Sequence, residues 1–289
     1  MQKQLNLKPI GLIILLAMAL TLSACQEAML LGGMVWTPRT SGTDEPLNGV
    51  TYGGNTFVAV GGWGSILTSS DGVSWTLKRG LTTYPLFGVT YGGGTFVAVG
   101  GFGTLFTSSD GVNWTPRTPQ GAPFLFSGVT YGNGTFVAVG NGGGILTSSD
   151  GVSWTPRTSG TNKDLYAGAY GNGTFVVVGS QGTVLTSPDG VTWTTQTSGT
   201  TNGLTGITYA NGTFVAVGAL GTILTSSDGV NWTKQNSGVE TTLQGVAYGR
   251  NTFVAVGDFG TLLTSGDGKV WKAQDTGKDL LAVAYGNGT

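Results

Sequence analysis

Residues 47–76 read LNGVTYGGNTFVAVGGWGSILTSSDGVSWT, and close copies of this stretch follow one another along the chain. The tryptophan near its end recurs every 39 or 40 residues, at Trp36, Trp75, Trp114, Trp154, Trp193, Trp232 and Trp271. A repeat of this kind is one supersecondary unit that buries its apolar face against the neighbouring units. The fold therefore depends on the structure of one repeat and on how successive repeats pack.

Each repeat contains four short β-type runs separated by turn residues, which in the first repeat are 49–52, 56–61, 66–69 and 74–78. Four strands in ~40 residues is the size of one propeller blade. The second run, TFVAVG, is apolar at nearly every position, which predicts a strand buried on both faces. Pairs such as Asn133-Gly134 predict tight hairpins between the first and second runs.

Proline recurs only in the fourth run, at Pro38, Pro116 and Pro156, so this run is expected at the outer edge of each blade. The fold class predicted is all-β: a β-propeller of four-stranded blades, with six full blades and a partial seventh. A flat β-solenoid is the rival, but it usually has shorter coils with one strand per turn. The glycine density and the lack of a 3.6-residue period exclude a helical solenoid.

The two ends of the repeat array suggest how the ring closes. The array begins with a fourth-strand sequence, Trp36 to Thr40, and stops within a first-strand sequence, Tyr285 to Thr289. We therefore expect a natural ring of seven blades and a sequence truncated at its C-terminus. The predicted division is a signal peptide over 1–24, a short tether over 25–35 and the propeller over 36–289.

Composition excludes several classes of function. The 289 residues include 53 glycines, no histidine and one cysteine, and only 9% are charged, with a net charge of −1. Such a chain has no basic field for nucleic acid and no histidine for a Ser–His–Asp or Cys–His site. It also lacks the Cys/His ligands of a zinc site. With 39% hydrophobic residues the chain can bury a core, and no metal or cofactor is expected.

The N-terminus has the pattern of an export signal. Lys3 and Lys8 precede a short apolar run over 10–22, which is too short to span a ~30 Å bilayer core as a permanent helix. Leu22-Ser23-Ala24-Cys25 resembles the lipobox of bacterial lipoproteins, which implies cleavage before Cys25 and its lipidation. The alternative is a plain signal peptide with an accidental cysteine. The resemblance predicts a membrane-anchored, extracytoplasmic protein, at the outer membrane if the cell has one.

An Asp-Gly pair precedes the tryptophan of each later repeat. With the preceding Ser or Thr, these pairs resemble the Asp-box (BNR) repeat, although Asp and Trp are one residue closer here than in that family. Similar repeats occur in the propellers of photosystem II assembly factors and in sialidases. An Asp side chain can close the turn by accepting backbone hydrogen bonds. We therefore predict a structural role rather than cation binding for Asp71, Asp110, Asp150, Asp189, Asp228 and Asp267.

The repeats differ mainly at the turn between the second and third runs and at the linker between blades. Both connections are expected on one face because the strands run alternately up and down. Loops on a rigid scaffold are where binding residues concentrate. The candidate ligand-face residues are Trp63, Phe102, Gln181, Leu220, Asp258, Phe259, Arg79 and Tyr84. The alternative is that the large side chains fold over the blades and cover the core.

Three classes of function remain open. The first is a non-catalytic, lipid-anchored binding or scaffold module for protein or glycan partners, which is the prediction. The second is a glycoside hydrolase similar to sialidases; that family needs an arginine cluster, whereas Arg39, Arg117 and Arg157 lie on separate outer strands. The glutamates Glu45 and Glu240 lie in linkers, so no carboxylate pair is positioned for glycosidic cleavage. The third is a purely structural surface repeat.

Overall fold

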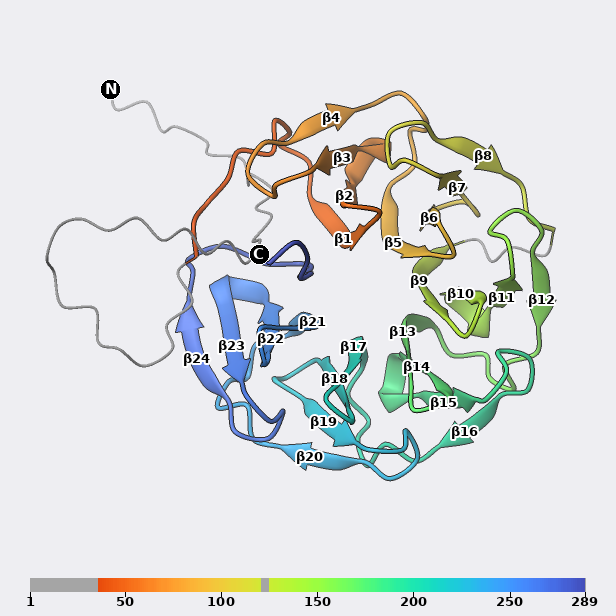
Figure 1. Cartoon of the computed structure of the whole chain (residues 1–289). Coiled ribbons are helices and arrows are strands. Elements are labelled where there is room, and N and C mark those ends of the chain that lie inside the picture. The colour runs from red at the N-terminus through yellow and green to blue at the C-terminus, as the bar shows by residue number, and fades with distance from the viewer. Residues whose placement is uncertain (1–35, 121–124, 289) are drawn as a thin grey trace, which may run out of the picture.

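The computed structural model describes residues 36–120 and 125–288. They form six four-stranded antiparallel sheets arranged in a ring around a central axis (Figure 1). Within every sheet the strands pair in chain order, from the innermost to the outermost. The chain is thus an all-β propeller with six complete blades, as the repeat predicted. The expected signal peptide, tether and Cys25 lie outside the described residues.

Strand boundaries repeat from blade to blade. The first strands are β1 (Leu47–Gly53), β5 (Leu86–Gly92), β9 (Phe126–Gly132), β13 (Leu165–Gly171), β17 (Leu204–Ala210) and β21 (Leu243–Gly249). The second strands are β2 (Thr56–Gly61), β6 (Thr95–Gly100), β10 (Thr135–Gly140), β14 (Thr174–Gly179), β18 (Thr213–Gly218) and β22 (Thr252–Gly257). The third strands are β3 (Ile66–Ser69), β7 (Leu105–Ser108), β11 (Ile145–Ser148), β15 (Val184–Ser187), β19 (Ile223–Ser226) and β23 (Thr261–Ser265). The outermost strands are β4 (Thr76–Lys78), β8 (Thr115–Arg117), β12 (Thr155–Arg157), β16 (Thr194–Gln196), β20 (Thr233–Gln235) and β24 (Lys272–Asp275).

The core lies between consecutive blades. In β10, Phe136, Ala138 and Val139 each have an exposed fraction of 1% or less. Val97 and Val99 of the preceding blade pack in one cluster with Phe136 and Ala138. The apolar second strand therefore has both faces covered, one by each neighbouring blade, as its lack of alternation predicted.

Glycine permits the innermost strands to approach closely. A Cβ at Gly132, the last residue of β9, would collide with the ring of Tyr170 from the next blade. That ring in turn packs against Phe175 of its own blade, with centroids 4.6 Å apart. Five of the six first strands end in Tyr–Gly and β17 ends in Tyr209–Ala210. The contact between this small residue and the tyrosine of the next blade thus sets the spacing between blades near the axis.

The Asp-Gly turns join the third and fourth strands of each blade. In one of them, Asp150 Oδ1 accepts hydrogen bonds from the backbone N–H groups of Val152 and Ser153, each at 2.8 Å. It also accepts from the Ser148 hydroxyl at 2.9 Å. The Trp154 indole then donates to the Gly151 carbonyl oxygen at 2.8 Å, which ties the turn to the blade. Equivalent bonds to Oδ1 are made at Asp71, Asp110, Asp189, Asp228 and Asp267.

The expected partial seventh blade is not shown as a sheet. Residues 36–40 and 280–285 lie outside the named strands. A ladder needs a neighbouring strand at hydrogen-bonding distance, and the described residues contain no second and third strands at this position. The outermost strands also begin at the residue after the tryptophan, later than expected, because the residues before it belong to the Asp-Gly turn.

The turn aspartates make stability depend on pH. Hydrogen bonds from the backbone N–H groups of Ser74 and Val73 lower the pKa of Asp71 from 3.8 to about 2. A lowered pKa stabilises the fold above the unfolded-state pKa, and that contribution is lost as pH falls through the folded-state value. The free energy of unfolding, measured with urea, should therefore fall between about pH 4 and pH 2. Asp71→Asn should lose less of this free energy over the same pH range, because it lacks one of the titrating carboxylates.

Asp44→Asn is the control, since it removes an exposed carboxylate from a linker instead of from a turn. If both variants kept the same pH dependence as the parent chain, the stabilising role of the turn carboxylates would be refuted.

Candidate binding face

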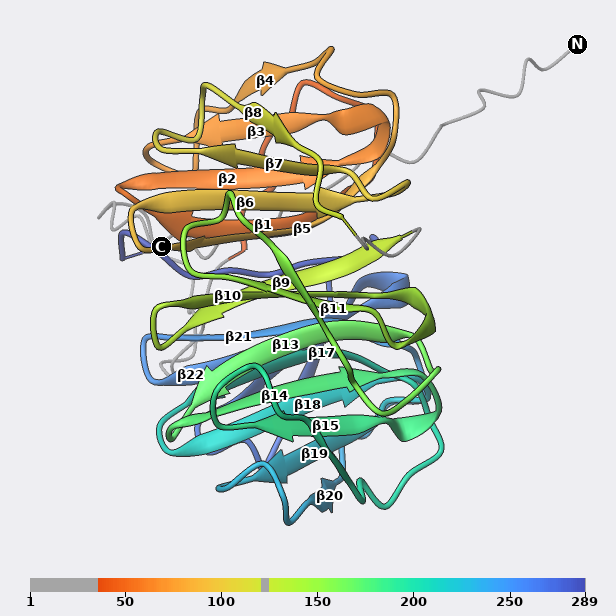
Figure 2. The ribbon, with the colours of Figure 1, turned by 90° about the vertical axis from the view of Figure 1, so that its right-hand side faces the viewer.

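The variable turns and the variable linkers lie on one face of the ring. In the first blade, the Gly62 N–H donates to the carbonyl oxygen of Pro46, in the linker before β1, at 2.9 Å. In the fourth blade, Ser180 makes the same bond to Asp164 at 2.9 Å. Seen edge-on in Figure 2, the strand connections form the two opposite faces of the ring. The turns between second and third strands and the linkers are therefore neighbours on the same side.

The turn between the second and third strands places its middle residue in the left-handed region. In the third blade this residue is Gly142, with a φ of 62°. In four other blades it is a large apolar residue at φ 51–54°, namely Trp63, Phe102, Leu220 and Phe259. The left-handed conformation costs a residue with a side chain about 1–2 kcal/mol. Glycine would satisfy this turn without that cost.

These apolar side chains are mostly exposed. The exposed fractions are 65% for Trp63, 57% for Phe102, 67% for Leu220 and 79% for Phe259. They therefore do not fold down to cover the core, and burial does not offset their backbone strain. Strain at an exposed apolar residue is an observation that points to function rather than to stability.

Phe102 has an aromatic neighbour from the adjoining linker. Its ring stacks on that of Tyr84, with centroids 4.3 Å apart and planes inclined by 28°. The two rings border a groove of about 550 Å³, whose other walls include Leu81, Pro116 and Arg117. This is an open, largely apolar depression on the variable face.

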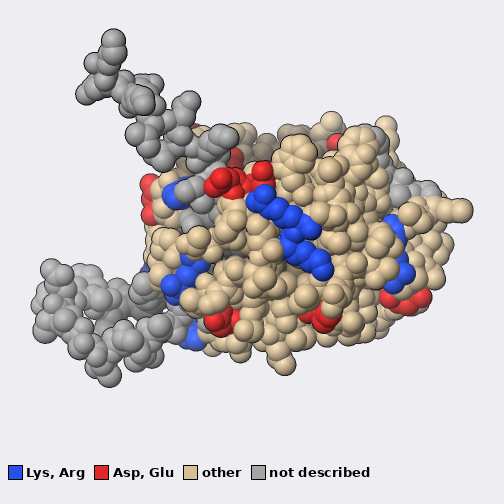
Figure 3. All heavy atoms as spheres, turned by 90° about the horizontal axis from the view of Figure 1, so that it is seen from above, with Lys and Arg blue, Asp and Glu red and all other residues tan. Residues whose placement is uncertain are grey.

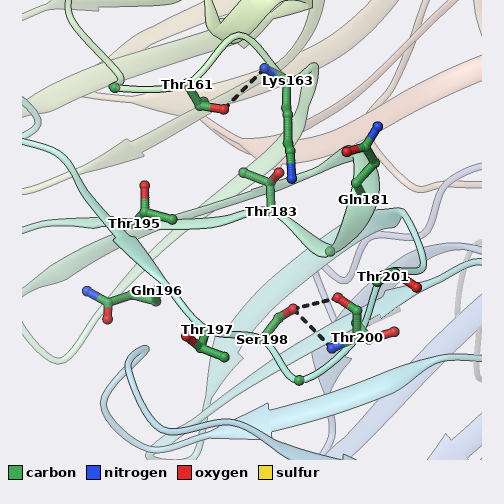
Figure 4. Close-up of a pocket in the computed structure, with 13 residues that line it drawn as sticks. Thr161, Lys163, Gln181, Thr183, Thr195, Gln196, Thr197, Ser198, Thr200 and Thr201 are labelled. Carbon is green, nitrogen blue, oxygen red and sulfur yellow. Dashed lines mark hydrogen bonds between the residues drawn. The ribbon is translucent and has the colours of Figure 1, made fainter.

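A second, polar groove lies beside the turn of the fourth blade. It has a volume of about 810 Å³ and is lined by hydroxyl, amide and ammonium groups, among them Lys163, Gln181, Thr183, Gln196 and Ser198. Lys163, Gln181 and Thr183 lie close together at one end (Figure 4). At the other end Ser198 is held by the Thr200 backbone, whose carbonyl oxygen accepts from its hydroxyl at 3.1 Å. The groove offers hydrogen bonds to a polar ligand.

Two residues predicted for this face are engaged in the fold. Asp258 is half-buried, and its Oδ1 accepts a hydrogen bond from Gln244 Nε2 at 2.8 Å. Arg79 is exposed, and its Nη2 donates to the Thr43 hydroxyl at 3.0 Å. The Asp258 carboxylate is thus hydrogen-bonded to Gln244, whereas the Phe259 side chain beside it is exposed.

Sequence reasoning missed the aspartates that fix these turns. The Gly142 N–H donates to Asp164 Oδ1 at 2.8 Å, and the Phe259 N–H donates to Asp279 Oδ1 at 2.6 Å. Both aspartates directly precede the leucine that begins a first-strand sequence. Aligning the linkers on that leucine would have found them.

In the part of the chain that the structure describes, several charged side chains are paired within their own blade. No three His, Cys, Asp or Glu side chains are grouped there as metal ligands. Arg117 and Arg157 each donate through Nε to a threonine hydroxyl of their own blade, at 2.9 and 2.8 Å. Figure 3 shows Lys and Arg interspersed with Asp and Glu on a mainly uncharged surface.

No family model matches this chain, and no curated protein matches its sequence. Solved structures do match its fold. A structure of YCF48 bound to a D1 peptide is 19% identical with a TM-score of 0.64, and the match covers 79% of this chain and 80% of that one. The fold is that of a β-propeller.

Two further structures share this propeller fold. YCF48 from Cyanidioschyzon merolae is 18% identical with a TM-score of 0.62, covering 82% of this chain and 87% of that one. Virginiamycin B lyase from Staphylococcus aureus is 12% identical with a TM-score of 0.73, covering 81% and 86%. Identities this low show the fold alone. Function is therefore inferred below from the residues on the surface of this propeller.

The strained turns give a matched pair of stability predictions. Phe259→Gly should leave the free energy of unfolding unchanged or raise it by up to about 1 kcal/mol, because relief of strain outweighs the entropy of the added glycine. Gly142→Phe should lower it by about 1–2 kcal/mol, since the same turn acquires the strain. Urea denaturation of both variants measures the two changes.

A loss of stability in Phe259→Gly comparable to that of a core truncation would show that the ring is packed, contrary to its exposure.

Proposed function

We propose that this propeller is a non-catalytic binding or scaffold module that takes protein partners on its variable face. The observation that carries the proposal is the set of exposed apolar residues in left-handed turns, Trp63, Phe102, Leu220 and Phe259. Each costs stability where glycine would not, so another benefit must retain it. Exposed aromatic side chains are enriched where proteins bind proteins.

The two grooves on this face define the kind of ligand. The groove beside Tyr84 and Phe102 is largely apolar, and the groove beside Gln181 and Lys163 offers more hydrogen-bonding groups. A protein segment that presents apolar side chains to the first groove and polar side chains to the second would match both. Among the similar folds, YCF48 is recorded with a bound peptide, which supports a propeller of this kind as a peptide-binding scaffold. A glycan is the alternative ligand, because aromatic rings beside amide and hydroxyl groups also suit sugars.

The proposed setting is the outside of the cell membrane, with the propeller tethered by lipid on Cys25. The lipobox-like sequence before this residue supports the tether. Within the described residues no helix is long and apolar enough to cross a membrane. In this setting the variable face would collect partners close to the membrane surface.

The test of binding compares the two faces of the ring. The chain is immobilised and exposed to a peptide array drawn from membrane and envelope proteins and, separately, to a glycan array. A variant with Trp63→Gly, Phe102→Gly, Leu220→Gly and Phe259→Gly should lose at least tenfold in affinity for the captured peptides while keeping its unfolding midpoint.

The control changes four exposed valines of the Asp-Gly turns, Val73, Val152, Val191 and Val230, to threonine. This variant should bind as the parent chain does. Equal losses in both variants, or capture of glycans alone, would contradict a protein-binding role for the variable face.

A further inference from the structure

An identical eight-residue sequence, WTPRTSGT, occurs at residues 36–43 and at residues 154–161. In the second copy the side chains of both the tryptophan and the arginine are hydrogen-bonded within the third blade. Trp154 Nε1 donates to the Gly151 carbonyl oxygen at 2.8 Å, and Arg157 Nε donates to Thr147 Oγ1 at 2.8 Å. The acceptors come from the Asp-Gly turn and from the third strand, β11.

The same two donors are unpaired in the first copy. Trp36 Nε1 and Arg39 Nε are buried from solvent, and neither has a hydrogen-bond partner among the residues that the structure describes. Buried donors in native proteins are nearly always paired, so two orphans in one short segment call for an explanation. Since the sequence is identical, the difference lies in the surroundings: within 36–120 and 125–288, no residue takes the place of Gly151 or Thr147 beside the first copy.

The inner ring shows where those equivalents belong. Residues 280–285 lie between β21 and β1, where the C-terminal segment runs toward the axis (Figure 1). A Cβ at Gly249 would collide with Tyr285, and one at Gly286 with Tyr52, which repeats the contact between consecutive blades elsewhere. The six first strands and this segment therefore occupy seven equivalent positions around the axis.

The apolar clusters divide at the same position. Elsewhere, valines of one blade pack with the phenylalanine of the next, as Val97 and Val99 do with Phe136. The cluster of Val254 and Val256 instead includes Leu280, Trp36 and Val283, and no phenylalanine among the described residues. The cluster of Phe57, Ala59 and Leu67 includes no valine from a preceding second strand. These are two halves of one interface, without the strands that would join them.

The backbone at residues 287–288 already has the conformation of the hairpin turn between a first and a second strand. Asn287 and Gly288 have φ values of 48° and 74°, as Asn172 and Gly173 do at 48° and 75° in the hairpin from β13 to β14. Asn287 Nδ2 also donates to the Ser70 carbonyl oxygen at 3.3 Å, just as Asn172 Nδ2 donates to that of Ser227 at 3.4 Å. The turn therefore directs the following backbone along the path of a second strand.

We infer that the space between the sixth and first blades is a docking site for a two-stranded β-hairpin of the repeat's own sequence, joined at the Asn287–Gly288 turn. Its first strand supplies the phenylalanine and valines that the two half-clusters lack. Its second strand supplies a threonine hydroxyl to Arg39, and its Asp-Gly turn supplies a carbonyl oxygen to Trp36. Residues 36–40 then form the outer strand of a seventh blade. The inference is independent of the proposed binding face.

The test extends the 289-residue chain after Thr289 by a copy of Phe136–Val152. The thermal unfolding midpoint should rise by at least about 5 °C, because a full blade interface is added on each side. The indole N–H of Trp36, assigned by its loss in Trp36→Phe, should exchange with D₂O at least about tenfold more slowly once it is hydrogen-bonded.

The control extension has the same residues in scrambled order and should change neither quantity. A double-mutant cycle between Arg39→Leu and Thr147→Val, the latter made only in the added copy, should be non-additive, since the two side chains pair directly. The inference is wrong if the native and scrambled extensions behave alike. It is also wrong if the unextended chain already protects Trp36 as a dimer, because a second copy then fills the site.

Discussion

The structure depends on the packing of each blade's second strand against both of its neighbours. Phe136 and Ala138 meet the valines of the preceding blade, and Val137 and Val139 meet Phe175 of the following one. No blade buries both faces of this strand by itself, so the stable unit is the ring and not the repeat. Near the axis, the Tyr–Gly contact sets the distance at which this packing occurs.

This constraint divides the surface into a constant and a variable part. The Asp-Gly turns are nearly invariant because their serine, aspartate and tryptophan are fully engaged in hydrogen bonds to the backbone and to one another. The turns opposite them have their backbone hydrogen-bonded to the linkers, while the large apolar side chains at the left-handed position are mostly exposed to solvent. That position can change from Gly142 to Phe259 without altering the blade. Variation there is tolerated by the scaffold and available to binding.

Much of the fold follows from the local pattern. The bounds predicted for the second and third strands of the first repeat, 56–61 and 66–69, are those of β2 and β3. The first strand is longer than predicted and the fourth shorter, because strand ends depend on partners rather than on local sequence. The candidate site was harder to predict from the sequence. Both Asp258 and Phe259 were assigned to the ligand face, but only the structure shows that Gln244 donates a hydrogen bond to the Asp258 carboxylate while the Phe259 ring is exposed.

The sequence by itself determined the unit: four strands, their order, the buried second strand and the turn types, all of which are written in residues close together in the chain. Only the tertiary structure decided how these units meet. The left-handed conformation of Phe259, the convergence of Lys163 and Gln181 on one groove, and the buried donors of Trp36 and Arg39 without partners among the described residues are visible only in three dimensions. Identical local sequences, such as the two WTPRTSGT segments, acquire different environments because hydrogen bonds and packing are satisfied across space rather than along the chain.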